Sequence, residues 1–231
     1  MRHLALMACG LALLQAASAG AQHPLVLSKL QELNAAAPQP SAEQLQKEIG
    51  VTAKAFAEAN GQCVPTGISV REVAAITGAR DVLQAALGGL IKNGWTAYAE
   101  HVGCPAGVRR YMVLMKADGT LIAAQVNEGR SFANPSIMRD TSALAALGAL
   151  QKVRSVDANC DGKDMDMGPT RVAGTSPDLG PDIYGVRYVG SWTEIWQFRT
   201  CGKLVDVPIE FRADGDGGAY SDIKEDGVTI L

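Results

Sequence analysis

The sequence predicts an α+β fold made of two related units, in which antiparallel strands (strand–Cys–strand–hairpin) pack with helices and disulfides cross-link each unit. Three observations support this prediction. Helical patterns precede alternating strand patterns twice along the chain, an even number of cysteines remains once the amino-terminal segment is removed, and cysteines and tryptophans recur at one constant offset.

The amino terminus has the pattern of a secretory signal peptide, which we place at residues 1–21. A basic start at residues 1–3 precedes an apolar run at residues 4–14 and then the small residues AASAGAQ. We expect cleavage after Ala21, with cleavage after Ala19 as the alternative. Later segments fall short of the roughly 20 apolar residues that cross a bilayer, so we expect an exported protein, periplasmic or secreted, without a transmembrane segment.

The charge balance argues against two classes of partner. Cleavage would leave 20 basic and 24 acidic side chains, because residues 1–21 hold one Arg and no acid, and the net charge would be −4. Nucleic acids and anionic membranes attract basic surfaces, so we expect neither as a partner. The partner is expected to be an unidentified protein, peptide or small ligand.

The four cysteines of the expected mature chain are Cys63, Cys104, Cys160 and Cys201. An even number in an exported chain indicates disulfides, and four cysteines allow three pairings. Cys63 precedes Cys104 by 41 positions and Cys160 precedes Cys201 by the same number, which favours these two bridges. A redox-active pair would have Cys-x-x-Cys spacing, which the sequence lacks.

An internal repeat at an offset of 97 residues accompanies the cysteines. GWTAYAEHVGC leads into RRYMVLMKADG, and SWTEIWQFRTC leads into VDVPIEFRADG with a shift of one residue. Each copy has the pattern of strand, turn, strand and an Asp-Gly hairpin turn. The segments between the first cysteine and the tryptophan differ between the copies, so we infer duplication of the strand–Cys–strand–hairpin unit only.

The first part of the chain divides into an amino-terminal arm and linker at 22–40 and a first α+β unit at 41–133. Ser41 with Gln44 forms a capping-box pattern that opens a helix to about Ala59. Ser69 with Glu72 repeats this signal and predicts helix as far as Asn93-Gly94. Strands are expected at about 95–102, 109–116 and 120–127.

The second part begins with a connecting helix at 134–154, for which Asn134-Pro135 suits the cap and the first helical position. The remaining residues, 155–231, are expected to form a second, mostly β unit. Residues 155–182 have a loop-rich composition, and strands are expected at about 185–189, 192–199, 204–211 and 219–223.

One loop has a weak resemblance in spacing to a calcium site. Asp157, Asn159, Asp161 and Gly162 of DANCDGKDMD occupy positions one, three, five and six of an EF-hand loop. Position twelve is Gly168 where the loop needs a bidentate Glu. We therefore expect no cofactor, with calcium as the weak alternative to a solvated acidic turn.

The strand at 191–201, SWTEIWQFRTC, holds the candidate ligand-binding residues. Strand alternation places Trp192, Glu194, Trp196 and Phe198 on one face. In one interpretation these aromatics are core and Glu194 is a satisfied ion pair, with Arg187 or Arg212 as the cation. In the other, the four side chains line a groove that takes a peptide or small ligand.

No catalytic signature is present, so an enzyme is less expected than a binding protein. The sequence lacks a G-x-S-x-G elbow, and Cys104, which lies near His101, is expected to be bridged. The preferred hypothesis is an exported, disulfide-bonded, non-catalytic binding or interaction module with an unknown ligand. An envelope-assembly accessory protein and an unrecognised hydrolase are the alternatives.

Overall fold

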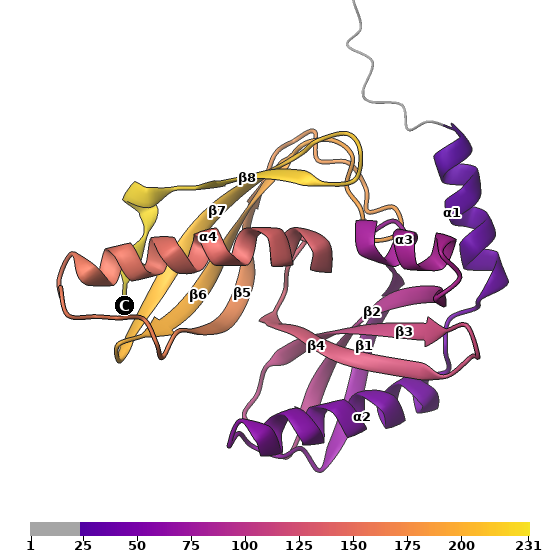
Figure 1. Ribbon diagram of the computed structural model, residues 1–231, viewed down its shortest axis with the longest axis horizontal. Coiled ribbons are helices and arrows are strands. Elements are labelled where there is room, and N and C mark those ends of the chain that lie inside the picture. The colour runs from indigo at the N-terminus through magenta and orange to yellow at the C-terminus, as the bar shows by residue number, and fades with distance from the viewer. Residues whose placement is uncertain (1–23) are drawn as a thin grey trace, which may run out of the picture.

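The computed structural model describes residues 24–231, which fold into four α-helices and a nine-stranded sheet (Figure 1). The helices are α1 (Pro24–Ala36), α2 (Ala42–Ala59), α3 (Arg80–Leu87) and α4 (Pro135–Arg154), and a 3-10 turn spans Glu225–Gly227. The strands are β1 (Gly67–Ala75), β2 (Ile91–Val102), β3 (Val108–Lys116), β4 (Leu121–Gly129), β5 (Asp166–Thr175), β6 (Ser191–Thr200), β7 (Lys203–Ala213), β8 (Ala219–Ile223) and β9 (Thr229–Ile230). The α+β class predicted from the sequence is therefore confirmed.

The strands form one open sheet in the order β1 to β8, with β9 paired to β7. Neighbouring strands are antiparallel except at the centre, where β4 and β5 are parallel over two residue pairs, Glu128 with Pro169 and Gly129 with Thr170. The sheet is thus mixed rather than purely antiparallel, because the chain crosses over through α4 between β4 and β5. The two halves predicted as separate units share this single sheet.

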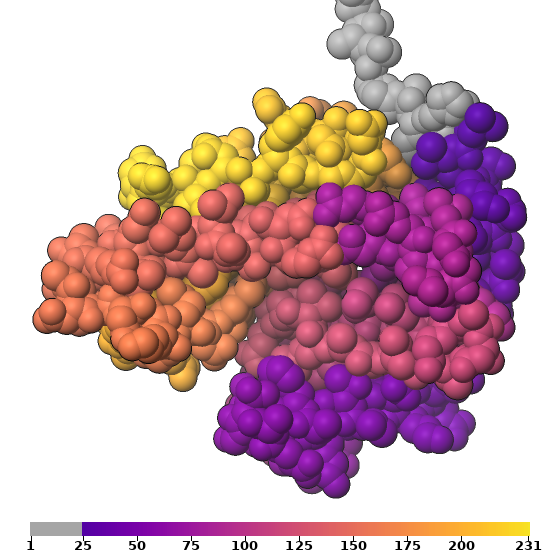
Figure 2. All heavy atoms as spheres, in the orientation of Figure 1, coloured from indigo at the N-terminus to yellow at the C-terminus, as the bar shows by residue number. Residues whose placement is uncertain are grey.

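A long helix packs on each half of the sheet, α2 on the first and α4 on the second, and α1 and α3 also pack on β2 (Figure 1). Leu45 and Ile49 of α2 pack on the small side chains of Ala97 and Ala99 in β2 and on the buried Tyr111 of β3. The longer α4 packs on β6 and β7 and covers a larger core that holds both tryptophans of β6. Figure 2 shows α3 and the start of α4 adjoining one another, and Arg139 of α4 forms an ion pair with Asp81 of α3 there.

Both predicted disulfides are present. Cys63 is bonded to Cys104 and Cys160 to Cys201, each pair with 5.8 Å between the Cα atoms. In each half the bridge joins the segment that follows the packed helix to the turn that follows a long strand, β2 or β6. The equal spacing in the sequence therefore corresponds to equivalent places in the two halves.

The prediction of a helix after Ser69 is wrong. Residues 67–75 form β1, and helix α3 begins only at Arg80 and ends at Leu87. Ile68, Val70 and Val73 pack under α2, so tertiary contacts and β-branched side chains outweigh the local capping signal.

Two further boundaries differ in the second half. The segment expected to be loop at 155–182 contains β5, which is irregular, with register shifts between Met167 and Thr170 and between Val172 and Gly174. The strand expected at 185–189 is reduced to a single bridge between Ile183 and Val186. Asn134 caps α4 as predicted, since its side chain accepts from the backbone N–H groups of Ser136 and Ile137.

The junction of the two halves depends on one glycine. Gly129 ends β4 with a φ of +78°, and a Cβ atom placed there would lie 2.1 Å from the carbonyl oxygen of Thr170 in β5. Only glycine combines this backbone conformation with so close an approach of two strands.

The predicted signal peptide lies outside the described residues. No helix in residues 24–231 is both long and apolar enough to cross a membrane.

Candidate functional site

The strand β6 alternates as the sequence predicts. Trp192, Glu194, Trp196 and Phe198 have exposed fractions of 2%, 0%, 0% and 2%, and the side chains between them are half-buried or exposed. The buried face packs against α4, so these four residues lie in the core of the second half. In this conformation they do not line an open groove.

The carboxylate of Glu194 is held by five hydrogen-bond donors. Oε1 accepts from the indole Nε1 of Trp192 at 2.9 Å and from the backbone N–H groups of Phe132 at 2.7 Å and Ala133 at 3.0 Å. Oε2 accepts from the hydroxyl of Ser131 at 2.7 Å and from the indole Nε1 of Trp196 at 2.8 Å. A buried carboxylate needs such donors, because removal from water is otherwise very costly.

The five donors replace the ion pair that the sequence suggested. Arg187 lies over the ring of Phe132, with Cζ 4.2 Å from the ring centroid, and Arg212 lies over Tyr220 at 5.4 Å. Among the described residues, no cation lies within ion-pair distance of Glu194. The carboxylate therefore sits among aromatics because two of them donate hydrogen bonds to it.

Glu194 thereby fixes the short segment 131–133 between β4 and α4. This segment ends the first half of the chain, whereas Glu194 belongs to the second half. The carbonyl oxygen of Ala133 accepts from Nη1 of Arg110 at 2.6 Å, and the carbonyl oxygen of Ser131 accepts from the hydroxyl of Tyr98 at 3.1 Å. The segment thus connects the buried carboxylate to side chains of the first half.

Those side chains line a cavity of about 590 Å³, which we call the arginine cavity. It lies on the face of β2 opposite α2, since Thr96 and Tyr98 alternate with the alanines that contact that helix. Its walls come from both halves of the chain: Glu72, Ala74, Ile76, Thr96, Tyr98, Arg110, Arg130, Ser131, Phe132, Thr170, Arg171, Val172, Asp182, Gly185 and Arg187. The volume is in the range usual for small-molecule sites.

Two of its four arginines are neutralised by carboxylates. Arg130 forms a two-pronged ion pair with Glu72, and this contact raises the pKa of Arg130 and lowers the pKa of Glu72. Nη2 of Arg171 lies 2.7 Å from Oδ2 of Asp206. The side chains of Arg130, Glu72 and Arg171 are more than half exposed, so these ion pairs stabilise the protein little.

The other two arginines, Arg110 and Arg187, are each anchored to a backbone carbonyl. Nη1 of Arg110 donates to Ala133, and Nη1 of Arg187 donates to Gly180 at 2.6 Å. Within the described part of the chain, the Nε atoms of both arginines and Oγ1 of Thr96 are buried and have no hydrogen-bond partner. Buried polar groups are almost always bonded, so three unpartnered polar atoms on residues that line one cavity mark it as a candidate site.

Arg110 keeps its charge although only 4% of the residue is exposed. Burial lowers the pKa of Arg110, and the neighbouring Tyr98, Glu194 and Asp182 raise it. A guanidinium stays protonated in proteins under all ordinary conditions. The caged carboxylate of Glu194 therefore also helps to hold a cation beside the arginine cavity.

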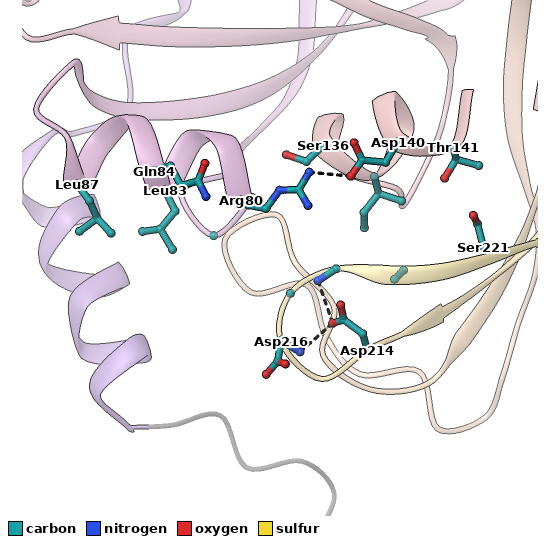
Figure 3. A pocket seen from close by; sticks show the side chains of 15 residues that line it. Arg80, Leu83, Gln84, Leu87, Ser136, Asp140, Thr141, Asp214, Asp216 and Ser221 are labelled. Carbon is teal, nitrogen blue, oxygen red and sulfur yellow. Dashed lines mark hydrogen bonds and ion pairs between the residues drawn. The ribbon is translucent and has the colours of Figure 1, made fainter. Parts of the chain in front are cut away.

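A second cavity, of about 440 Å³, lies between α3, the start of α4 and the β7–β8 turn (Figure 3). Three of its four charged side chains, those of Arg80, Asp140 and Asp214, have partners within the chain. Arg80 lies 2.7 Å from Asp140, and Oδ1 of Asp214 accepts from the backbone N–H groups of Asp216 and Gly218. These contacts shape the turn and the helix ends, and they give no indication of a ligand.

The weak calcium candidates form a turn between α4 and β5. Oδ1 of Asp157 accepts from the backbone N–H of Asn159, and Oδ1 of Asp161 accepts from that of Lys163, whose Nζ lies 2.8 Å from Oδ2. Over residues 24–231, no group of three or more His, Cys, Asp or Glu side chains is placed to hold a metal ion.

The candidate cavity has no signature in the sequence. Arg110, Arg130, Arg171 and Arg187 are spread over almost 80 positions, and contacts between the two halves, among them the parallel pairing of β4 with β5, bring them to one cavity. In comparisons with known proteins, no protein family, no curated protein and no solved structure matches this chain.

Proposed function

We propose that the chain is an exported, non-catalytic binding module of a bacterial-type periplasm or cell exterior, and that it takes a small organic anion in the arginine cavity. One observation carries this proposal. The buried Arg110 and Arg187 line the same cavity, and among residues 24–231 neither has a carboxylate partner within ion-pair distance and the Nε atom of each has no hydrogen-bond partner. Guanidinium groups recognise carboxylate and similar anions through paired hydrogen bonds.

In this proposal the residues of β6 support the site from behind. Glu194, with Trp192 and Trp196, fixes the segment 131–133, whose residues Ser131 and Phe132 line the cavity. Phe198 adds core packing. Ligand recognition would then depend on the aromatic and acidic residues of β6 without direct contact.

The two disulfides support an extracytoplasmic location, where such bonds form and persist. The order of elements supports the proposed duplication, since each half has a long helix, α2 or α4, packed on strands that follow it, and one bridge at an equivalent place. The halves differ where the cavity is built: residues 130–133 follow β4 in the first half, and the second half supplies Glu194.

The proposal is tested by a thermal-shift screen of small organic acids against their neutral amides. We expect acids to raise the Tm of the wild-type chain and the amides to leave it unchanged, because ligand that binds only the folded state stabilises it. Arg187→Met should abolish the shift. Arg212→Met is the matched control, since Arg212 also stacks on a ring but does not line the cavity. Equal shifts with acids and amides, or an unchanged response of Arg187→Met, would refute the proposal.

A further inference from the structure

We infer that the ligand of the arginine cavity is a monocarboxylate with a flat, ring-bearing body. This inference rests on the proposed function and adds the chemical class of the ligand. It follows from the charge of the cavity, from the free donors of its arginines and from the rings beside them.

The charge of the cavity favours a single negative charge on the ligand. Glu72 and Asp206 neutralise Arg130 and Arg171. The lining that remains has two cations, Arg110 and Arg187, and one carboxylate, Asp182, while Glu194 acts on Arg110 from behind and does not face a ligand in the cavity. A ligand with one negative charge therefore balances the site, whereas a dianion would leave an excess of negative charge in a partly buried space.

The free donors of the two arginines suit a carboxylate. Each guanidinium uses Nη1 for a backbone carbonyl, so the Nε side of the group is the side without a protein partner among the described residues. The Nε and Nη2 hydrogens of a guanidinium are parallel and match the two oxygens of a carboxylate. A phosphate can use the same fork, so the charge of the cavity, not the fork, favours a monocarboxylate over phosphate.

The rings beside the arginines favour a flat body. Cζ of Arg187 lies 4.2 Å from the centroid of Phe132, and Cζ of Arg130 lies 5.0 Å from that of Tyr98. When a carboxylate accepts hydrogen bonds in the plane of a guanidinium that stacks on a ring, the group attached to the carboxylate extends in the plane of that guanidinium. A conjugated ring acid continues this plane beside Phe132, Tyr98 and the apolar Ile76, and a bulky saturated acid does not.

The walls that would contact the body are fixed before a ligand arrives. The backbone N–H of Phe132 donates to Glu194, and the hydroxyl of Tyr98 donates to the carbonyl of Ser131. A site with prearranged rings loses little conformational entropy on binding. The selectivity for flat acids should therefore be a property of the free protein.

The experiment is isothermal titration of the mature chain with 2-naphthoate, 2-naphthamide, benzoate, cyclohexanecarboxylate and inorganic phosphate. We expect 2-naphthoate to bind at least tenfold more tightly than 2-naphthamide, and benzoate more tightly than cyclohexanecarboxylate. Arg187→Lys keeps the charge but lacks the planar fork, so it should weaken naphthoate at least tenfold, whereas Arg212→Lys should not.

The outcomes separate this inference from the proposed function. Binding of phosphate or of saturated acids in preference to ring acids would overturn the inference and leave anion binding in place. Failure of every acid would overturn both. The comparisons between ligands use the wild-type chain, so they decide the question even if a variant at Arg187 does not fold.

Discussion

Replacement of Glu194 by glutamine tests whether the carboxylate holds the interior together. The substitution keeps the size of the side chain and changes one oxygen into an NH₂ group. The amide oxygen can take the place of Oε1 and accept from Trp192, Phe132 and Ala133. The NH₂ group would then face the two donors from which Oε2 accepts, the hydroxyl of Ser131 and the indole N–H of Trp196.

The expected cost is about 3 kcal/mol of the free energy of unfolding. The hydroxyl of Ser131 can rotate and accept, but the indole N–H of Trp196 cannot, and a stranded buried donor costs roughly 1–3 kcal/mol. The hydrogen bonds that remain lose the strengthening that a charged acceptor gives, which is about 1 kcal/mol each at most. Relief from burying a charge offsets part of this loss.

Urea unfolding followed by tryptophan fluorescence measures the effect, since two of the three tryptophans donate to Glu194. The midpoint should fall and the slope with urea should stay the same. Glu58→Gln is the matched control on an exposed turn of α2, where the change should be within about 0.5 kcal/mol. A loss in the free energy of unfolding for Glu194→Gln as small as that of the control would refute the stabilising role of the five hydrogen bonds to Glu194.

Three further predictions concern the frame around the site. Gly129→Ala should cost about 3 kcal/mol in urea unfolding, because it adds a clash to a left-handed backbone, whereas Gly174→Ala in β5 meets no atom within 4 Å and should cost under about 1 kcal/mol; equal effects would contradict the tight junction. Burial and Arg109 lower the pKa of His101 from 6.5 to about 4. Below pH 6.5 the unfolded chain gains a proton that the folded chain gains only near pH 4, so the free energy of unfolding should fall by roughly 2–3 kcal/mol between pH 7 and 4.5, and His101→Gln should remove most of this fall. Joint replacement of Cys160 and Cys201 by serine should cost about 4 kcal/mol through the entropy of the unfolded chain, measured against the wild type under oxidising conditions; an unchanged midpoint would count against a structural role.

The sequence predicts the parts of this molecule that local chemistry determines. The capping box at Ser41 and the cap at Asn134 depend on residues close together in the chain, and the structure confirms both. The disulfides join residues 41 positions apart, and the repeat of that spacing in the two halves predicts the pairing that the structure confirms. The alternation of SWTEIWQFRTC predicts which side chains of β6 are buried, because strand geometry leaves two faces only.

The parts that fail depend on distant contacts. β1 has a helical start signal at Ser69, but its apolar side chains gain more by packing under α2 than by forming a helix. β5 has Gly, Pro and register shifts, and it is a strand because β6 lies beside it. The arginine cavity is the extreme case, since its charged groups come from strands and loops that only the assembled sheet brings together.

The comparison of the two halves explains why the acid stands in β6. At the offset of 97 residues, Glu194 corresponds to Ala97 and Trp196 to Ala99. In the first half these alanines leave room for α2 to lie close on the sheet. In the second half the carboxylate of Glu194 accepts from the backbone of the segment 131–133, and Trp196 donates to that carboxylate. Because that segment anchors Arg110, loss of the Glu194 carboxylate should change the arginine cavity although no atom of Glu194 lines it.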